Sequence, residues 1–351
     1  MRNNIMFFIA LFAISIFTLA GCGGGGGSAP AGTTVNRGVV TAEGNIVVNG
    51  VFYNISSANI VIDGLAATKN DLKVGMVVTV KGIFDNRTSH AIRRTASRVE
   101  LVSNFQGPVD CVNPLDNSLT IMGQQVLVKT TPPNQTVFAN FSSLRTIFAN
   151  ISTVSKLNRE GHLSPDFGSQ PPLYSIVKVS GFYNDINGFQ ATRIELVEPG
   201  VDLTDPTTPH PVWIKGTVTD VDVPGKAFAI GNLTVDYSGM IPAYQPNFLV
   251  PGLFVNVQGL STEFETGNAP SLTFVDPHLI QRANEGVAAQ EGDHVTVMGY
   301  VSGLSGTSFT IGGTRVDASS FSLSGITNAV LLQVEGTFSG GVLVASKITR
   351  L

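Results

Sequence analysis

The sequence predicts an all-β protein of tandem small five-stranded barrels, about four repeats, with one amphipathic helix inserted in the second. Three observations support this. The chain holds 38 glycines in 351 residues and only 13% charged residues, a composition typical of strands and turns. Its length favours several domains over one core. A pattern of strands and tight turns also recurs along it.

The recurring unit opens with a Gly-x-Val strand. About ten residues later comes a short apolar strand that ends in a turn sequence such as Asn-Gly or Gly-Gly, and these residues reach positive φ easily. The four openings are Gly38-Val39-Val40, Gly107-Pro108-Val109, Gly216-Thr217-Val218 and Gly299-Tyr300-Val301. The turns are Asn49-Gly50, Met122-Gly123, Gly231-Asn232 and Gly312-Gly313, and each leads into a third strand.

A fourth strand alternates apolar and polar residues and ends in glycine, which places one face in a core and the other in water. Its four versions are Val78-Thr79-Val80-Lys81-Gly82, Val177-Lys178-Val179-Ser180-Gly181, Val255-Asn256-Val257-Gln258-Gly259 and Leu332-Gln333-Val334-Glu335-Gly336. A second hairpin follows at Asn187-Gly188, Gly267-Asn268 and Gly340-Gly341. A fifth strand with Ala and a β-branched residue closes the unit, although the third unit is looser there.

Five strands in a unit this small would leave two bare edges unless the sheet closes. We therefore expect barrels, each with its own core. Two topologies remain open from the sequence, an oligonucleotide/oligosaccharide-binding (OB-like) barrel and a simple meander.

The second unit carries an insertion at residues 130–172. Within it Leu144, Ile147, Phe148, Ile151 and Val154 follow helical spacing, with Ser142 or Ser143 as the N-cap. This predicts one amphipathic helix that covers a barrel end or forms a binding lid. The expected organisation is a signal peptide at 1–21, a tether at 22–34, β-domains at 35–104, 105–198, 212–284 and 292–351, and a Pro-rich linker at 199–211. We expect few contacts to cross that linker.

The N-terminus predicts export and lipidation. Arg2 precedes an apolar run from Ile5 to Ala20, too short for a membrane span and typical of a signal peptide. The run ends in Leu19-Ala20-Gly21-Cys22, which resembles the lipobox of bacterial lipoproteins. The resemblance implies that Cys22 is acylated and becomes the mature N-terminus. Gly23 lacks the inner-membrane retention signal of an Asp, so the expected location is the outer membrane, on its periplasmic or surface face.

Charge and cysteine content narrow the function. The net charge is −4 and no cluster of Lys and Arg occurs, which argues against nucleic acid as a partner. Beyond Cys22 there is only Cys111, so neither an intrachain disulfide nor a cysteine-based zinc site is expected. The five histidines are scattered, and we expect no metal and no cofactor.

The sequence also resembles a known family. The residues Leu72-Lys73-Val74-Gly75-Met76-Val77, the fourth strand that follows them and Ala96-Ser97-Arg98-Val99-Glu100 are similar to a bacterial family described only as domain of unknown function 5666. The first two repeats match this pattern better than the third and fourth. The resemblance implies a repeated, lipobox-bearing envelope protein and implies no catalytic residue.

No catalytic motif is present, and we expect no enzyme. The favoured function is a structural or protein-interaction module of the cell envelope, held to the membrane through the lipid. The alternative is a glycan- or other ligand-binding module, because an exposed ring stacks on sugars. The candidate ligand-binding rings are Trp213, Tyr244 and Tyr183. The alternative for each of them is a ring buried in the core with its polar atom hydrogen-bonded.

Overall fold

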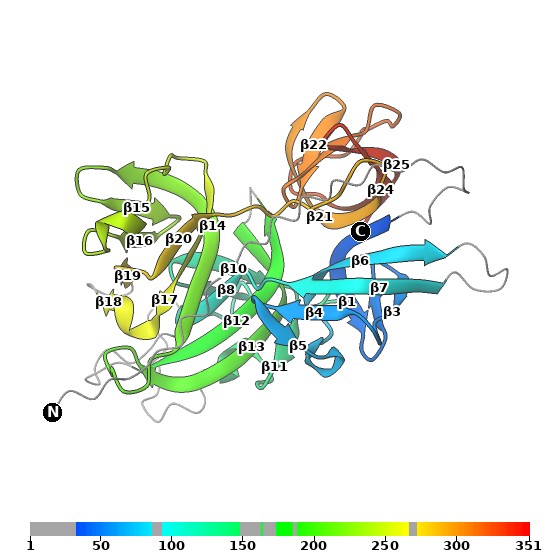
Figure 1. Cartoon of the computed structure of the whole chain (residues 1–351). Coiled ribbons are helices and arrows are strands. Elements are labelled where there is room, and N and C mark those ends of the chain that lie inside the picture. The colour runs from blue at the N-terminus through cyan, green and yellow to red at the C-terminus, as the bar shows by residue number, and fades with distance from the viewer. Residues whose placement is uncertain (1–32, 86–92, 148–162, 164–172, 185–187, 267–271) are drawn as a thin grey trace. The chain divides into compact units, whose positions relative to one another are not determined.

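A computed structural model describes residues 33–85, 93–147, 163, 173–184, 188–266 and 272–351 (Figure 1). In this part of the chain the protein is all-β, with one 12-stranded and one 13-stranded sheet. The other elements are four 3-10 turns, η1 (Lys69–Asp71), η2 (Leu144–Thr146), η3 (Pro242–Tyr244) and η4 (Ser261–Glu263). The all-β fold class is therefore confirmed. The predicted signal peptide and most of the tether lie outside the described residues.

The strands fall into four segments in chain order. Segment one contains β1 (Thr33–Ala42), β2 (Ile46–Val48), β3 (Val51–Asn54), β4 (Asn59–Ile62), β5 (Leu65–Ala67), β6 (Val77–Asp85) and β7 (Arg93–Leu101). Segment two contains β8 (Phe105–Asn113), β9 (Ser118–Ile121), β10 (Gln124–Val128), β11 (Val137–Ala139), β12 (Leu173–Asn184) and β13 (Gly188–Asp202). Segment three contains β14 (Pro211–Asp222), β15 (Ala227–Ile230), β16 (Leu233–Asp236), β17 (Phe254–Leu260), β18 (Phe264–Thr266), β19 (Leu272–Val275) and β20 (Leu279–Arg282). Segment four contains β21 (His294–Ser305), β22 (Ser308–Ile311), β23 (Thr314–Asp317), β24 (Leu331–Ser339) and β25 (Val342–Arg350).

Segments one, two and four each close into a five-stranded barrel. In segment one β1 pairs β2, β2 pairs β3, β3 pairs β7 in parallel, β7 pairs β6, and β6 returns to β1. Segments two and four repeat this order with a parallel third-to-fifth pairing, β10 with β13 and β23 with β25. A meander would pair the third strand with the fourth, so the pairing excludes it and leaves the OB-like alternative.

Segment three departs from the predicted closure. Its fourth strand β17 pairs β14 and β20, whereas its fifth strand β19 pairs β16 and β18. Among the described residues no pairing joins β17 to β19, so this ring stays open, and residues 267–271 lie outside the description. The prediction of four closed barrels is therefore not supported for this segment. The sequence was already irregular there, because its fifth strand lacks the Ala-x-x-Val/Ile pattern.

The glycine that ends the fourth strand marks a β-bulge in segments one, two and four. The register shifts at Gly82, Gly181 and Gly336 in the pairing with the fifth strand. A Cβ at Gly181 would collide with the carbonyl oxygen of Gln190 in the fifth strand. At Gly82 and Gly336 a Cβ would likewise collide with a carbonyl oxygen of the fifth strand of that segment. The bulge bends the strand and increases its twist, which a small barrel needs to close.

The predicted tight turns are present where the structure describes them. Asn49-Gly50, Met122-Gly123 and Gly312-Gly313 each hold two successive residues at positive φ, the conformation of a type I′ hairpin. Gly340-Gly341 does the same in the second hairpin of segment four. The turns predicted at Asn187-Gly188 and Gly267-Asn268 include residues outside the described part.

The helix predicted within the insertion at 130–172 is not found among the residues of this insertion that the structure describes. The described part of it contains the strand β11 and the single 3-10 turn η2. Thr146 donates its hydroxyl to the carbonyl of Ser143 at 2.8 Å, a local bond that competes with helical pairing. Leu144 and Ile147 are nevertheless buried in the core, as their spacing indicated. Phe148, Ile151 and Val154 lie outside the described residues.

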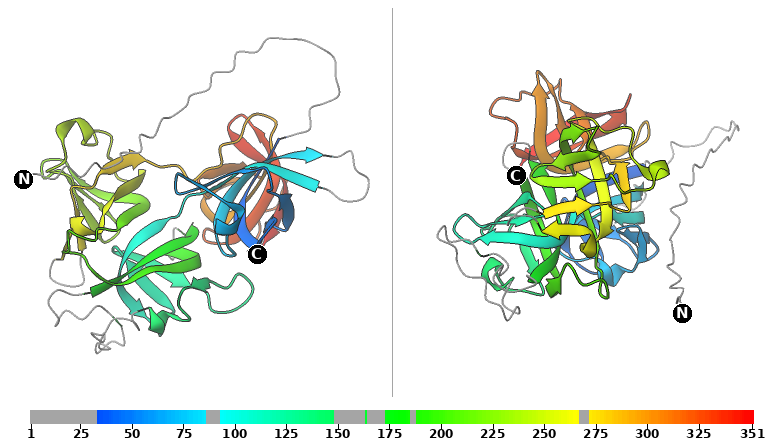
Figure 2. Two further views of the ribbon diagram at one scale, coloured as in Figure 1. Left: turned by 60° about the horizontal axis from the view of Figure 1, so that its bottom comes forward. Right: turned by 90° about the vertical axis from the view of Figure 1, so that its left-hand side faces the viewer.

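The segments do not have four separate cores. One apolar cluster takes side chains from both segments two and three, including Phe105, Val177, Ile214 and Val255. The strand β14 pairs β8 across the two segments, and the carboxamide of Gln124 donates to the carbonyl of Ile230 at 2.5 Å. The expectation that few contacts cross the linker is therefore wrong. In Figures 1 and 2 the long strands β12, β13 and β14 mark this joined part in green.

The strand β1 likewise links segments one and four. It pairs in parallel with β21, and Val35 belongs to the core of segment four. The remaining core of segment one is a cluster of its own around Tyr53, Val80 and Val99.

Val255 tests the shared core. The side chain is fully buried, so Val255→Asp would place an unpaired charge there at a cost of several kcal/mol. We expect segments two and three to lose amide hydrogen-exchange protection together. The matched control is Val223→Asp, since Val223 is 70% exposed and should tolerate the charge. Loss of protection confined to residues 211–282 would contradict the shared core.

Candidate functional site

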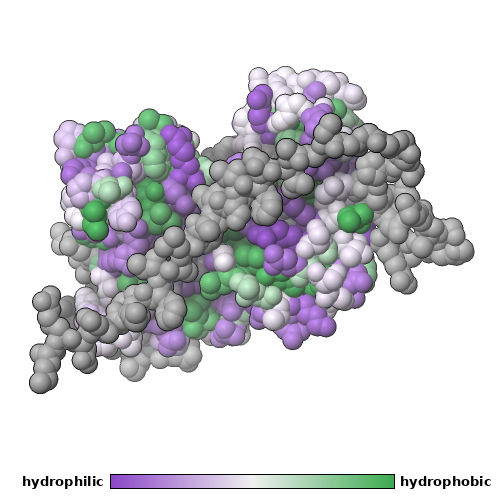
Figure 3. All heavy atoms as spheres, in the orientation of Figure 1, coloured by the Kyte–Doolittle hydropathy of each residue, from purple (hydrophilic) through white to green (hydrophobic). Residues whose placement is uncertain are grey.

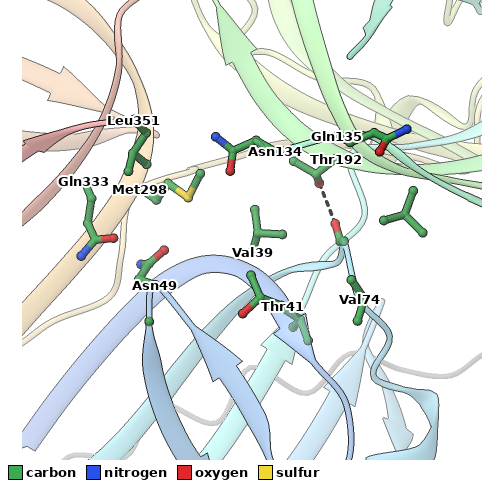
Figure 4. A pocket seen from close by; sticks show the side chains of 14 residues that line it. Val39, Thr41, Asn49, Val74, Asn134, Gln135, Thr192, Met298, Gln333 and Leu351 are labelled. Atoms are coloured by element: carbon green, nitrogen blue, oxygen red, sulfur yellow. Dashed lines mark hydrogen bonds between the residues drawn. The ribbon is translucent and has the colours of Figure 1, made fainter. Parts of the chain in front are cut away.

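A cavity of about 350 Å³ lies where segments one, two and four meet (Figure 4). Segment one supplies β1 and the turn between β2 and β3. Segment two supplies the loop before β11 and one side chain of β13. Segment four supplies side chains of β21 and β24. Its volume is within the range of small-molecule sites.

The lining side chains are uncharged. The apolar ones are Val39, Val40, Val74, Val137, Met298 and Leu351, and the polar ones are Thr41, Asn49, Asn134, Gln135, Thr192 and Gln333. Four of the six polar side chains are carboxamides, which both donate and accept hydrogen bonds. Such a wall suits a neutral ligand with apolar and hydrogen-bonding parts.

Hydrogen bonds between segments one and two hold the cavity wall. The hydroxyl of Thr192 donates to the carbonyl of Gly75 at 2.6 Å, the contact drawn in Figure 4. The guanidinium of Arg193 donates to the carbonyl of Val74 at 3.1 Å. Gly75 has φ of +89° and no space for a Cβ, because the carbonyl of Thr192 lies against it. The close approach of the two segments therefore requires glycine here.

The β2–β3 turn presents Asn49 to the cavity. Its amide nitrogen donates to the Asn36 side chain at 2.7 Å and to the Arg37 carbonyl at 2.9 Å. Its oxygen is buried and accepts no hydrogen bond among the described residues. Asn134 and Gln135, by contrast, are exposed on the loop before β11, and their carboxamides make no hydrogen bond within the described part of the chain.

A second polar cluster surrounds the short connection between segments one and two, residues 102–105, which we name the junction. Asn104 is 5% exposed and uses all its polar groups. Its backbone N–H donates to Val179 at 3.0 Å, and its carbonyl accepts from the N–H of Lys215 at 3.1 Å. Its side-chain oxygen accepts from Gly181 at 3.2 Å, and its amide donates to Glu285 at 3.4 Å. One residue thus contacts β12, β14 and the connection to segment four.

Ser103 extends the junction to the β4–β5 turn. Its N–H and hydroxyl donate to the two carboxylate oxygens of Asp63 at 2.6 and 3.1 Å. Asp63 also forms an ion pair with Lys178 at 2.5 Å, and both side chains are largely buried. Burial lowers the pKa of nearby Lys215 to about 8, while Glu285 and Asp63 oppose this.

Two of the three predicted ligand-binding rings belong to this structural region. The indole N–H of Trp213 donates to the carbonyl of Ser103 at 3.3 Å, and Lys178 lies 5.7 Å from its ring centroid. Tyr183 packs edge-on against Phe189 and Phe254 at 5.0 and 5.3 Å, and its hydroxyl donates to the carbonyl of Lys215. Burial raises the pKa of Tyr183 well above its ordinary value.

Tyr244 is the exposed ring of the three, at 68%. It lies in η3 within a stretch, Tyr237 to Thr262, that contains no charged residue. Ile241 and Val250 in the same stretch are 64% and 55% exposed. Figure 3 shows green apolar atoms interspersed with purple hydrophilic ones over the segment that contains β15 and β16. The three predicted rings therefore do not form one groove of exposed aromatics.

Asp110 is a buried acid in segment two. It occupies the bulge of β8 between Val109 and Cys111, and its carboxylate accepts from the N–H of Gly123 at 2.6 Å. Burial raises its pKa to about 8, against the hydrogen bonds from Gly123 and Met122. In segments one and three the bulge residue is Thr41 or Thr219, whose hydroxyl donates to a carbonyl of the next strand at 3.3 Å. Asp110 is exceptional among these positions because it carries an acid.

The remaining predicted residues are less informative. Cys22, the predicted lipidation site, lies outside the described residues. Cys111 is a half-buried free thiol whose pKa burial raises. Within the described ranges, no group of three or more His, Cys, Asp and Glu could hold a metal ion. No helix of that part of the chain is long and apolar enough to cross a membrane.

Sequence reasoning missed Asn104, Asp110 and the carboxamides of the cavity. Asp110 had a signal, because it occupies the position of Thr41, Thr219 and Ser302 directly after the Gly-x-Val motif. Asn104 had none, since its partners come from three distant parts of the chain. The cavity likewise depends on contacts among segments that are far apart in sequence.

The comparisons with known proteins agree with this architecture in part. The family described as Domain of unknown function (DUF5666) matches residues 35–100 and 298–349. The predicted resemblance is confirmed for these two stretches, which lie in segments one and four, whereas the sequence alone favoured the first two repeats. In segment two the insertion separates β10 from β12 and interrupts the pattern. No curated protein and no solved structure matches the chain.

We expect Asp110 to make the stability of the fold depend on pH. Because folding raises the pKa of its carboxyl, the folded state holds this proton at a pH where the unfolded state has released it. The contribution of the group to the free energy of unfolding is therefore fully present below the ordinary carboxyl range and is lost as pH rises towards about 8. Asp110→Asn keeps an uncharged group at this position. The denaturation midpoint of the variant should therefore change less than that of the wild type between about pH 5 and about pH 9.

The control for this experiment is Asp220→Asn, because Asp220 is exposed on β14. Its pH profile should follow that of the wild type. If Asp110→Asn and the wild type have the same profile across this range, Asp110 does not titrate as its burial requires.

Proposed function

We propose that the chain is a lipid-anchored, non-catalytic protein of the bacterial cell envelope that serves as a rigid scaffold for protein interaction. Its body would consist of four divergent copies of one five-stranded unit. The lipid on Cys22 would attach the body to the outer membrane, and the residues after it would act as a flexible tether.

Support for the fourfold repetition comes from features shared by the segments. The family match covers parts of segments one and four. Segment two has the same strand order, with a parallel third-to-fifth pairing. In segment three, β14 bulges after Val218, as β1 does after Val40 and β8 after Val109. A common unit whose third copy has opened accounts for all of these features.

Support for a scaffold comes from the junction. Asn104 and Asp63 bind strands and turns of different segments, and the shared core joins segments two and three. Relative motion of segments one, two and three would break several buried hydrogen bonds at once, each worth about 1 kcal/mol. A body of this kind presents its surfaces at constant spacing.

The observation that carries the interaction role is the uncharged stretch from Tyr237 to Thr262. Its apolar side chains Ile241, Tyr244 and Val250 are each more than half exposed. Apolar groups gathered on a surface mark protein contacts when they rest on a stable support. Tyr244 is the one aromatic ring of this stretch that is more than half exposed, which favours a protein partner over a glycan that several rings in one groove would bind.

The proposed anchor is tested with Cys22→Ser, which removes the thiol that would carry the lipid. We expect the wild type in the membrane fraction and the variant in the soluble fraction after cell disruption. Cys111→Ser is the matched control and should remain with the membranes. A Cys22→Ser protein that still sediments with membranes would overturn the lipid anchor.

A further inference from the structure

We propose that the cavity between segments one, two and four binds an uncharged peptide segment with small aliphatic side chains. This inference rests on the proposed interaction function and names the chemistry of one contact. The cavity is separate from the exposed stretch around Tyr244, which lies in segment three.

The side chains of the lining select against anionic ligands. All twelve side chains that line the cavity beside its two glycines are neutral. A carboxylate or phosphate that enters this site loses hydration and meets no cationic side chain. The ligand must therefore carry no negative charge where it contacts this wall.

The polar groups of the lining match peptide groups. A peptide bond offers one N–H donor and one carbonyl acceptor, and a carboxamide answers both. Asn134 and Gln135 carry carboxamides that make no hydrogen bond within the described residues, so they are available to a ligand. Both are exposed on one short loop at the cavity.

The apolar part of the wall is aliphatic. Val39, Val74, Val137 and Met298 line the cavity, and among the described residues no aromatic side chain does. Small aliphatic side chains such as those of alanine and valine fit this surface. A sugar ring would find no aromatic face to stack on, so the lining favours peptide over glycan.

The walls are held before any ligand arrives. Thr192 and Arg193 are hydrogen-bonded to Gly75 and Val74, and Val77, Phe182 and Met298 pack together from three segments. A site with ordered walls loses little conformational entropy on binding. A peptide in this cavity would contact three segments at once.

The test uses the full-length mature protein and a blocked tripeptide, N-acetyl-Ala-Val-Ala-amide, in calorimetric titration. We expect saturable binding to the wild type. The double variant Asn134→Gly with Gln135→Ala should bind about tenfold more weakly, since it removes two hydrogen-bonding carboxamides. Glycine suits this position, because Asn134 has φ of +65°.

The matched control combines Asn117→Gly with Gln281→Ala. Asn117 also has positive φ, at +55°, and both residues lie outside the cavity lining. This variant should bind as the wild type does. The blocked peptide N-acetyl-Ala-Glu-Ala-amide should bind at least about tenfold more weakly than its Val counterpart, because its charge would be desolvated.

Three results would overturn the proposal: no tripeptide binding at about 1 mM, equal binding by both double variants, or tighter binding of an N-acetylglucosamine trimer than of the tripeptide. Each result concerns the cavity alone. The membrane anchor is judged separately by the fractionation of Cys22→Ser, so either proposal can fail without the other.

Discussion

The satisfied polar groups of Asn104 hold the segments together. This one buried residue donates to Val179 and accepts from Gly181 in β12, accepts from Lys215 in β14, and donates to Glu285 before segment four. A buried amide left without partners would cost about 1–3 kcal/mol for each group, so the four contacts are strongly preferred together. The junction is therefore an ordered connection that holds segments one and two to each other. A flexible spacer would leave these groups in water.

The other contacts between the segments depend on the junction. Ser103 brings the β4–β5 turn and Asp63 to Lys178, and Trp213 covers the same region with its indole N–H bonded to Ser103. With segments one and two held in this way, Thr192 reaches Gly75 and the cavity wall forms. The cavity is thus a product of the contacts between barrels, and no single barrel contains it.

The sequence was informative where a feature is local and limited where it is not. Period-two strands, Asn-Gly and Gly-Gly turns and the glycine after each fourth strand are local, and the structure contains them. The helix in the insertion was expected from apolar spacing and from Ser142 or Ser143 as its N-cap, but Thr146 binds Ser143 and the described turn is 3-10. The opening of segment three and the shared core depend on pairings such as β17 with β20 and β8 with β14, which spacing within one strand does not reveal. The roles of the candidate rings were likewise not predictable from the sequence, because Trp213 and Tyr183 bind at the junction through partners that are distant in sequence.

The central claim, that Asn104 couples the segments, is tested most directly by native-state hydrogen exchange of Asn104→Ala. The account predicts that the amide of Gly181 loses protection because its side-chain acceptor is gone, and that the other amides of β12 and those of β14 lose protection with it. Asn70, which is exposed in η1 and changed to Ala as the control, should leave both strands protected. If Asn104→Ala changes the exchange of only its immediate neighbours while the rest of β12 and β14 keep their full protection, the junction does not hold the segments together.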